Sequence, residues 1–150
     1  MVELTGINDG MLRDKPTIKE VIGEFAKFCD GAVLVAHNAS FDMAFFERAF
    51  RDAGLPFEHP KMDTLTLVRN LYPEQKSFKL GNMCKFLGIN LSKAHRAVHD
   101  ARATGEMMLI ALSKLTEEKG VKTVEDLNSA FVGDAGVSVV KSMKYTIQNC

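Results

Sequence analysis

The sequence has 150 residues, the size of one domain, and 46% of them are hydrophobic, so a sizeable core is possible without disulfides. Nineteen basic and nineteen acidic residues give a net charge of zero, which provides no global signature of nucleic-acid binding. The longest apolar run, Met107–Leu112, is far shorter than the roughly 20 residues of a membrane helix, and no signal peptide is visible. These properties exclude a membrane-spanning chain and favour a cytoplasmic protein with no membrane partner.

The three cysteines, Cys29, Cys84 and Cys150, are odd in number and widely spaced. No Cys-x-x-Cys pair occurs, so neither a zinc site nor a disulfide framework is indicated. Cys29 and Cys84 lie in helical patterns, and we expect them to be small core residues rather than reactive thiols.

The chain in order predicts a helix-rich α/β domain. The first half reads as a loop (Met1–Lys15), a helix with Pro16 in its first turn (Pro16–Asp30), a strand buried on both faces (Val33–Ala36) and a second helix (Ser40–Ala53). The second half reads as a short strand near Met62, a helix capped by Asp63 that ends near Tyr72, a helix over Ser77–Leu87, a loop over Asn90–Ala94, a long helix over Arg96–Lys119 and a short helix over Thr123–Ala130.

The stretch Val33–Asp42, VLVAHNASFD, runs from an apolar strand through a polar tip into a helix. Ser40 is the expected N-cap, which places Asp42 in the first helical turn beside the carboxyl end of a strand. Ligands collect at that position in open α/β sheets. Asp42, Phe45, Phe46 and Ala49 follow helical spacing, so Asp42 is predicted to point along the buried face.

A second carboxylate, Asp100, is predicted in the first turns of the long helix, on one face with Thr104, Met107, Met108 and Ala111. Buried carboxylates are costly unless they are paired or bind a metal, so Asp42 and Asp100 are candidates to share hard divalent cations. His95 lies five residues before Asp100, where it could take a proton from water. Taken singly, each of these residues is more often structural, since first-turn aspartates complement the helix dipole.

AHNASFD followed by AHRAVHDARAT resembles the second and third motifs of the DEDDh 3′→5′ exonucleases, which have the RNase H-like fold. The third motif is His, four residues, Asp, as in His95–Asp100. Within this family the segment ELTGINDGMLRDKPTIKEV is most similar to the proofreading exonuclease domain of PolC-type DNA polymerase III. The polymerase III epsilon subunit and the exonuclease part of some helicases are close alternatives.

This resemblance implies removal of nucleotides from DNA 3′ ends by hydrolysis with two divalent cations, Mg²⁺ or Mn²⁺, in replication proofreading. It implies that Asp42 and Asp100 are metal ligands and that His95 is the general base. It places four residues against the substrate, a single-stranded or frayed DNA 3′ end: His37, Asn38, Phe41 and Arg96. Lys79 and Arg102 are further candidates for phosphate contacts, although solvated charges are the ordinary interpretation of both.

The first motif of the family, Asp-any-Glu on the first strand, is not found in Met1–Asp30. We therefore expect a domain over residues 1–131 that lacks the N-terminal antiparallel strands, with 132–150 as a linker or the start of a following polymerase region. The rest of a polymerase chain is the expected partner. The alternative to an exonuclease is a catalytically inactive nucleic-acid-binding or structural remnant. The loss of flanking strands also predicts marginal stability or self-association.

Overall fold

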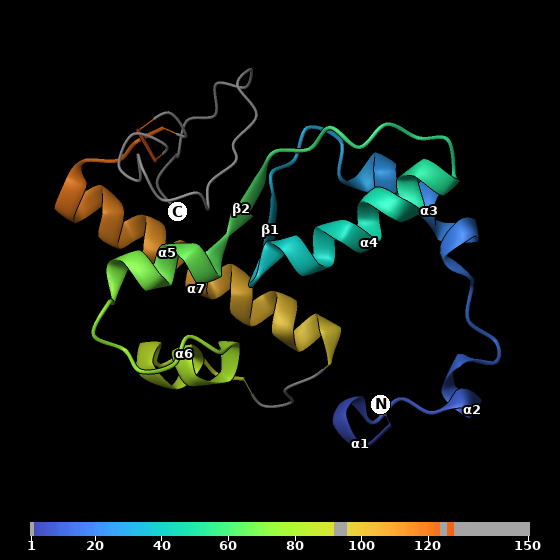
Figure 1. The fold of residues 1–150 in the computed structure, drawn as a ribbon, viewed down its shortest axis with the longest axis horizontal. Coiled ribbons are helices and arrows are strands. Elements are labelled where there is room, and N and C mark those ends of the chain that lie inside the picture. Colours follow the sequence, from blue (N-terminus) through green and yellow to red (C-terminus); the bar gives the residue numbers. More distant parts are fainter. Residues whose placement is uncertain (1, 92–95, 124–125, 128–150) are drawn as a thin grey trace.

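A computed structural model describes residues 2–91, 96–123 and 126–127 of the protein (Figure 1). The elements, in order, are α1 (Val2–Thr5), α2 (Asp9–Leu12), α3 (Ile18–Phe28), β1 (Leu34–Ala36), α4 (Ala39–Asp52), β2 (Lys61–Asp63), α5 (Thr64–Leu71), α6 (Leu80–Leu87) and α7 (Ala97–Lys119). None of the described helices is long and apolar enough to cross a membrane. The predicted linker 132–150 lies outside the described residues.

The two strands form a parallel sheet, with Leu34 opposite Lys61 and Ala36 opposite Asp63. Parallel strands need a crossover, and α4 supplies it between β1 and β2. Figure 1 shows the strands between the pair α3–α4 and the group α5, α6 and α7. This arrangement confirms the predicted strand near Met62 and the helix-rich α/β class.

Strand β1 is less buried than predicted. Leu34 and Ala36 are half-buried, and Val35 is 37% exposed. Among the described residues β2 is the sole strand paired with β1, and no described strand pairs with the other edge of β1. Helices α4 and α7 contact the strand but cover it only in part. The prediction of burial on both faces was therefore wrong.

Helix α7 joins two hydrophobic clusters. Its residues Met108, Ala111 and Leu115 pack with Met62 and Leu67, and its residues Ala103 and Met107 pack with α5 and α6. This confirms the predicted apolar face of the long helix. Cys29 and Cys84 are buried, which confirms that they are core residues, and burial raises the pKa of each thiol, so both stay protonated at neutral pH.

Aromatic rings hold α3 against α4. The Phe25 ring stacks on Phe46 with centroids 4.9 Å apart and meets Phe50 edge-on at 6.4 Å. The buried residues of α4 are Ala39, Met43 and Phe50. Of the predicted stripe Phe45, Phe46, Ala49 and Phe50, only Phe50 is fully buried, and Phe45 is 64% exposed. The α3 stripe is also incomplete, because Ile18 is 54% exposed and Phe28 is 83% exposed.

Several predicted boundaries moved. The N-terminal loop contains the one-turn helices α1 and α2, and Asn8 caps α2 by accepting a hydrogen bond from the Met11 N–H. Helix α3 begins after Pro16, with Thr17 as its N-cap. Helix α6 begins at Leu80 rather than Ser77, because Lys79 is extended and forms its N-cap. The predicted ends at Gly88 and Gly120 are confirmed, and both glycines have positive φ.

Candidate functional site

The tip after β1 is built around a left-handed residue. Asn38 has φ 71°, a conformation that asparagine tolerates better than most residues, and it turns the chain directly into α4. Helix α4 therefore begins at Ala39, and the prediction of Ser40 as N-cap was wrong. The Asn38 N–H donates to Asp63 Oδ1 at 2.9 Å, and the Leu65 N–H donates to the same oxygen at 2.9 Å. Asp63 thus caps α5, as predicted, and also ties the end of β2 to the tip of β1.

His37 connects this tip to the segment before α6. Its Nε2 lies 2.7 Å from the Phe78 carbonyl oxygen, and its Nδ1 lies 2.9 Å from Thr64 Oγ1. Because a carbonyl can only accept, Nε2 carries a proton and donates to Phe78. The Thr64 hydroxyl, which lies beside Nδ1, also lies 3.3 Å from the Ala36 carbonyl oxygen, to which it can donate. Both ring nitrogens already have protein partners, so the geometry favours a positioning role for His37 over a direct phosphate contact.

Asp42 and Phe41 lie in the first turn of α4 and face outward. Asp42 is exposed, so the prediction that it points along a buried face was wrong. The buried stripe one residue away packs against α3 and the sheet and leaves this face uncovered by described residues. Phe41 is 64% exposed and meets the equally exposed Phe45 edge-on at 5.2 Å. Phe41 is therefore not a core residue.

Asp100 lies in the first turn of α7 and is half-buried, on the same face as the buried Thr104 and Met107. Burial, then the Asp100 carboxylate and then the Glu106 carboxylate raise the pKa of the Cys84 thiol. Arg96 is the exposed N-cap residue of α7, and Arg102 pairs with Glu106 at 2.9 Å. His95, the predicted general base, lies outside the described residues.

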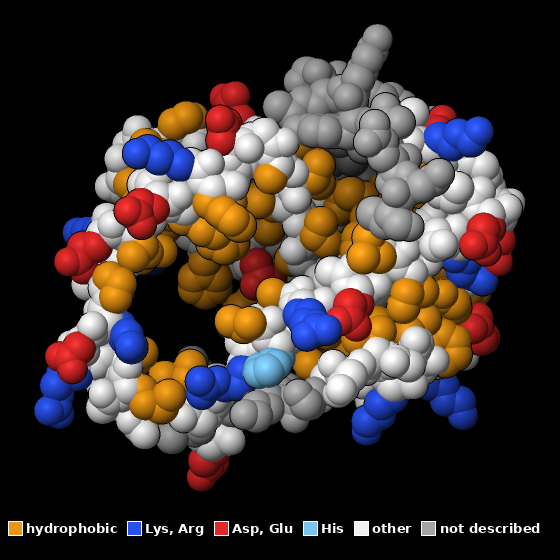
Figure 2. All heavy atoms as spheres, turned by 180° about the vertical axis from the view of Figure 1, so that it is seen from behind, with side chains coloured by type: hydrophobic (Ala, Val, Ile, Leu, Met, Phe, Trp, Pro, Cys, Tyr) orange, Lys and Arg blue, Asp and Glu red, His pale blue; other side chains and the backbone are white. Residues whose placement is uncertain are grey.

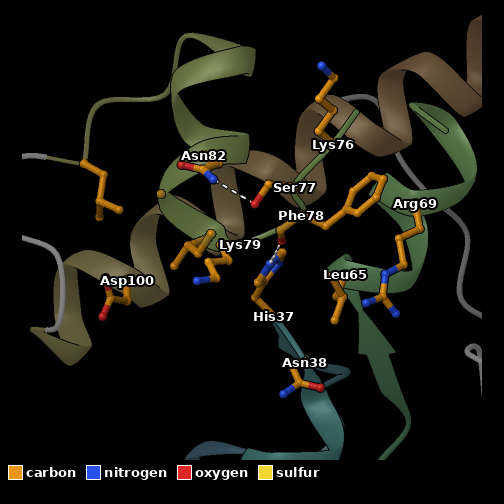
Figure 3. A pocket seen from close by; sticks show the side chains of 13 residues that line it. His37, Asn38, Leu65, Arg69, Lys76, Ser77, Phe78, Lys79, Asn82 and Asp100 are labelled. Carbon is orange, nitrogen blue, oxygen red and sulfur yellow. Dashed lines mark hydrogen bonds between the residues drawn. The ribbon is translucent and has the colours of Figure 1, made fainter. Parts of the chain in front are cut away.

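A pocket of about 840 Å³ brings some of these residues together (Figure 3). His37, Asn38 and Asp100 line it, whereas Asp42, Phe41 and Arg96 are not among the described residues that do. The remaining lining residues come from α5, from the segment before α6, from α6 and from the loop before α7: Leu65, Arg69, Lys76, Ser77, Phe78, Lys79, Leu80, Gly81, Asn82 and Leu91.

The carboxylates of Asp42 and Asp100 suit a hard divalent cation, which prefers oxygen ligands. Neither carboxylate forms a hydrogen bond or salt bridge with a residue that the structure describes, so their oxygens are available. No group of three or more His, Cys, Asp or Glu side chains in the described ranges is placed to hold a metal ion. The described chain therefore offers part of a ligand set.

Sequence reasoning recognised Asp63 only as a helix cap and did not consider Arg69. The signal for Asp63 was present, because it ends the second strand and the carboxyl ends of parallel strands meet at one edge of a sheet. Arg69 gives no such signal, since its place depends on how α5 packs.

Comparison with known proteins gives one family and one fold. A family model described as Exonuclease matches residues 1–108. A solved structure titled Exonuclease X in complex with 5′ overhanging duplex DNA matches with a TM-score of 0.58 and 25% identity, over 80% of this chain and 66% of that chain. These matches confirm the predicted RNase H-like exonuclease fold.

Curated relatives are PolC-type DNA polymerases III. The identity is 43% over 132 residues for the protein of Caldanaerobacter subterraneus subsp. tengcongensis, 42% over 137 for Clostridium perfringens and 45% over 137 for Bacillus cereus. The matches cover 88%, 91% and 90% of this chain, but 9%, 10% and 10% of those proteins. The chain spans about a tenth of the length of the curated relatives it matches.

Proposed function

The chain belongs to the exonuclease family, and we propose that it removes nucleotides one at a time from DNA 3′ ends, as the proofreading part of a cytoplasmic PolC-type DNA polymerase III. The family match over residues 1–108 carries this proposal. The similarity to PolC-type polymerases supports the role in replication and the rest of such a polymerase as partner.

In the proposed reaction, water attacks the last phosphodiester, the bond from phosphorus to the 3′-oxygen breaks, and a nucleoside 5′-monophosphate leaves. Asp42 and Asp100 would be ligands of two divalent cations, Mg²⁺ or Mn²⁺, and these cations, when bound, would stabilise the charge that develops on the phosphate. His95 takes the proton of the attacking water. The exposure of Asp42 and the free oxygens of both carboxylates support this assignment.

The substrate contacts follow from the same placement. Phe41, exposed next to Asp42, stacks on the terminal base or sugar. Asn38 contacts the terminal nucleotide from the tip of β1, and Arg96 contacts a phosphate at the start of α7. His37 positions the tip of β1 through the contacts of its ring nitrogens with Thr64 and Phe78.

The test is hydrolysis of a 5′-labelled primer with a mismatched 3′ end, with Mg²⁺ or Mn²⁺ and with EDTA. We expect a ladder of products shortened one nucleotide at a time, no reaction in EDTA, and a loss of roughly a hundredfold or more in Asp42→Asn, Asp100→Asn and His95→Ala. Asp52→Asn, an exposed carboxylate at the other end of α4, is the matched control and keeps full activity.

Activity that survives Asp100→Asn and His95→Ala unchanged contradicts the site assignment. A ladder that begins at the 5′ end of a 3′-labelled primer contradicts the polarity. Binding of the primer without hydrolysis by the wild-type chain, in either metal, supports the inactive nucleic-acid-binding alternative.

A further inference from the structure

The pocket beside Asp100 carries positive charge that the proposed reaction does not use. Arg69, Lys76 and Lys79 line it, against the single carboxylate of Asp100 among its described lining residues. All three cationic residues are exposed, and no described salt bridge neutralises any of them. In a chain with zero net charge, this concentration of cations at one pocket is a local feature.

The pocket has apolar walls between these charges. Leu65, Phe78 and Leu91 line it, and its volume of about 840 Å³ lies within the range of about 300–1,000 Å³ of small-ligand sites. Figure 3 shows Lys79 between Asp100 and His37, with Arg69 on the other side of His37 near Leu65, while Lys76 points away from His37. Cations that flank an apolar surface suit a nucleotide, whose phosphate is charged and whose base is flat and apolar on its faces.

The Arg69 side chain has a defined position. Its guanidinium lies 5.8 Å from the centre of the Phe78 ring, and the Phe78 carbonyl accepts the hydrogen bond from His37. The hydrogen bond from His37 therefore holds Phe78 in place, and with it the neighbouring Lys79 and the ring that the Arg69 guanidinium contacts. One side of this pocket is thus attached to the tip of β1 by this hydrogen bond, and Asn38 at the same tip also lines the pocket.

From this placement we propose that the pocket binds the nucleotide on the 5′ side of the scissile bond, with Lys79 and Arg69 on its phosphates. The inference rests on the proposed exonuclease function, which assigns Asp100 to the metal and Asn38 to the cleaved nucleotide, and both of these residues line the pocket. The pocket makes the enzyme sensitive to substrate length: a substrate that ends at the cleaved nucleotide leaves it empty.

The test compares two substrates of the full chain, a single-stranded oligonucleotide and the p-nitrophenyl ester of thymidine 5′-monophosphate, which carries no second nucleotide. We expect Lys79→Gln and Arg69→Gln to lower kcat/KM for the oligonucleotide roughly three- to tenfold, mainly through KM, and to lower it much less for the ester. Arg69→Lys restores most of the loss if charge is the cause. Lys85→Gln, an exposed lysine of α6 outside the pocket, is the matched control.

Binding without catalysis separates this proposal from the proposed function. With a fluorescent oligonucleotide in EDTA, each variant should weaken binding and reduce the slope of log K against log salt by roughly 0.7. Such a loss in a chain that hydrolyses neither substrate supports the pocket and contradicts the nuclease. Three results would contradict the pocket. The Lys79 and Arg69 variants could lose equal factors of kcat/KM for both substrates, or bind thymidine 5′-monophosphate as much more weakly as they bind the oligonucleotide. They could also bind the oligonucleotide as tightly as Lys85→Gln does.

Discussion

At the residue scale, the site depends on Asn38 and His37, which neighbour each other but do different work. Asn38 provides a backbone conformation that most side chains disfavour, and its N–H is held by Asp63. His37 uses both ring nitrogens to reach Thr64 and Phe78. The polar tip of β1 is therefore a junction between strands, α5 and the segment before α6, as well as a candidate substrate contact.

Substitutions of Asn38 can distinguish its backbone role in folding from a contact of its side chain with the substrate. Asn38→Ala should lower the free energy of unfolding by about 1 kcal/mol, because alanine disfavours the left-handed region, whereas Asn38→Gly should be close to neutral since glycine accepts it. Urea denaturation measures both. If the amide contacts the terminal nucleotide, the glycine variant keeps its stability and still loses activity. Equal destabilisation by Gly and Ala would show that the side chain, not φ, matters for folding.

His37→Ala should cost about 2 kcal/mol of unfolding free energy, because it removes two hydrogen bonds and leaves the Phe78 carbonyl without this donor. Thr64→Val keeps the His37–Phe78 bond and should cost less, about 1 kcal/mol. Hydrogen exchange around residues 78–80 provides the second readout and should rise in His37→Ala alone. If the two variants exchange equally there, His37 does not hold this segment.

At the element scale, helix termini carry most of what positions the site. Asp63 caps α5, Asn38 begins α4, and α7 places Asp100 in its first turn. Helix α3 is further from the site and begins with a capping box, in which the Thr17 N–H donates to Glu20 Oε2 at 2.7 Å and the Thr17 hydroxyl lies 2.8 Å from it.

The capping box makes α3 sensitive to acid. The backbone N–H of Thr17, and then its hydroxyl, lower the pKa of Glu20 below the ordinary value of 4.5. A carboxylate with a lowered pKa contributes stability that is present above its unfolded pKa, so this contribution is lost as the pH falls below about 4.5 through the folded pKa. Titration of Glu20 by NMR, with hydrogen exchange in α3, measures both effects.

Glu20→Gln should remove this part of the pH dependence, while Glu24→Gln on the same helix leaves the capping box intact and should keep it. A Glu20 that titrates at or above 4.5 in the folded chain would contradict the capping geometry.

At the scale of the whole molecule, apolar surface is the main departure from a compact domain. Among the described residues, exposed large hydrophobic side chains occur on several elements: Phe28 at 83%, Val98 at 79%, and Phe41 and Phe45 at 64% each. Figure 2 shows hydrophobic side chains at the border of an opening in one face. Large exposed apolar patches are typical of interaction surfaces or of chains that associate.

We therefore expect the isolated chain to self-associate as its concentration rises, which is the measurable form of the self-association predicted from the sequence. Sedimentation velocity from low to high micromolar concentration measures this. Phe28→Ser should weaken the association roughly tenfold, since burial of a phenylalanine side chain contributes about 1.5–3 kcal/mol. Lys19→Ser, on the same helix, is the control. A monomer at all concentrations would contradict this prediction.

The sequence by itself determined the family, the α/β class and the approximate course of the helices. These features depend on short patterns: the spacing of AHNASFD and AHRAVHDARAT, an apolar strand, and glycines such as Gly88 and Gly120 that end helices in the left-handed conformation. Asp42 and Asp100 were correctly placed in first helical turns for the same reason. The same spacing predicted the buried face of α7 correctly, but on α4 apolar residues occur on more than one face, and so Asp42 and Phe45 were wrongly assigned to the buried one.

The tertiary structure alone decided which distant groups meet. His37 finds partners 27 and 41 residues away, and Asn38 finds Asp63 25 residues away. It also brought Arg69 and Lys79 to one pocket with Asp100. Such contacts depend on the parallel register of β1 with β2 and on how α5 and α6 pack against α7, and no periodicity within one segment encodes them.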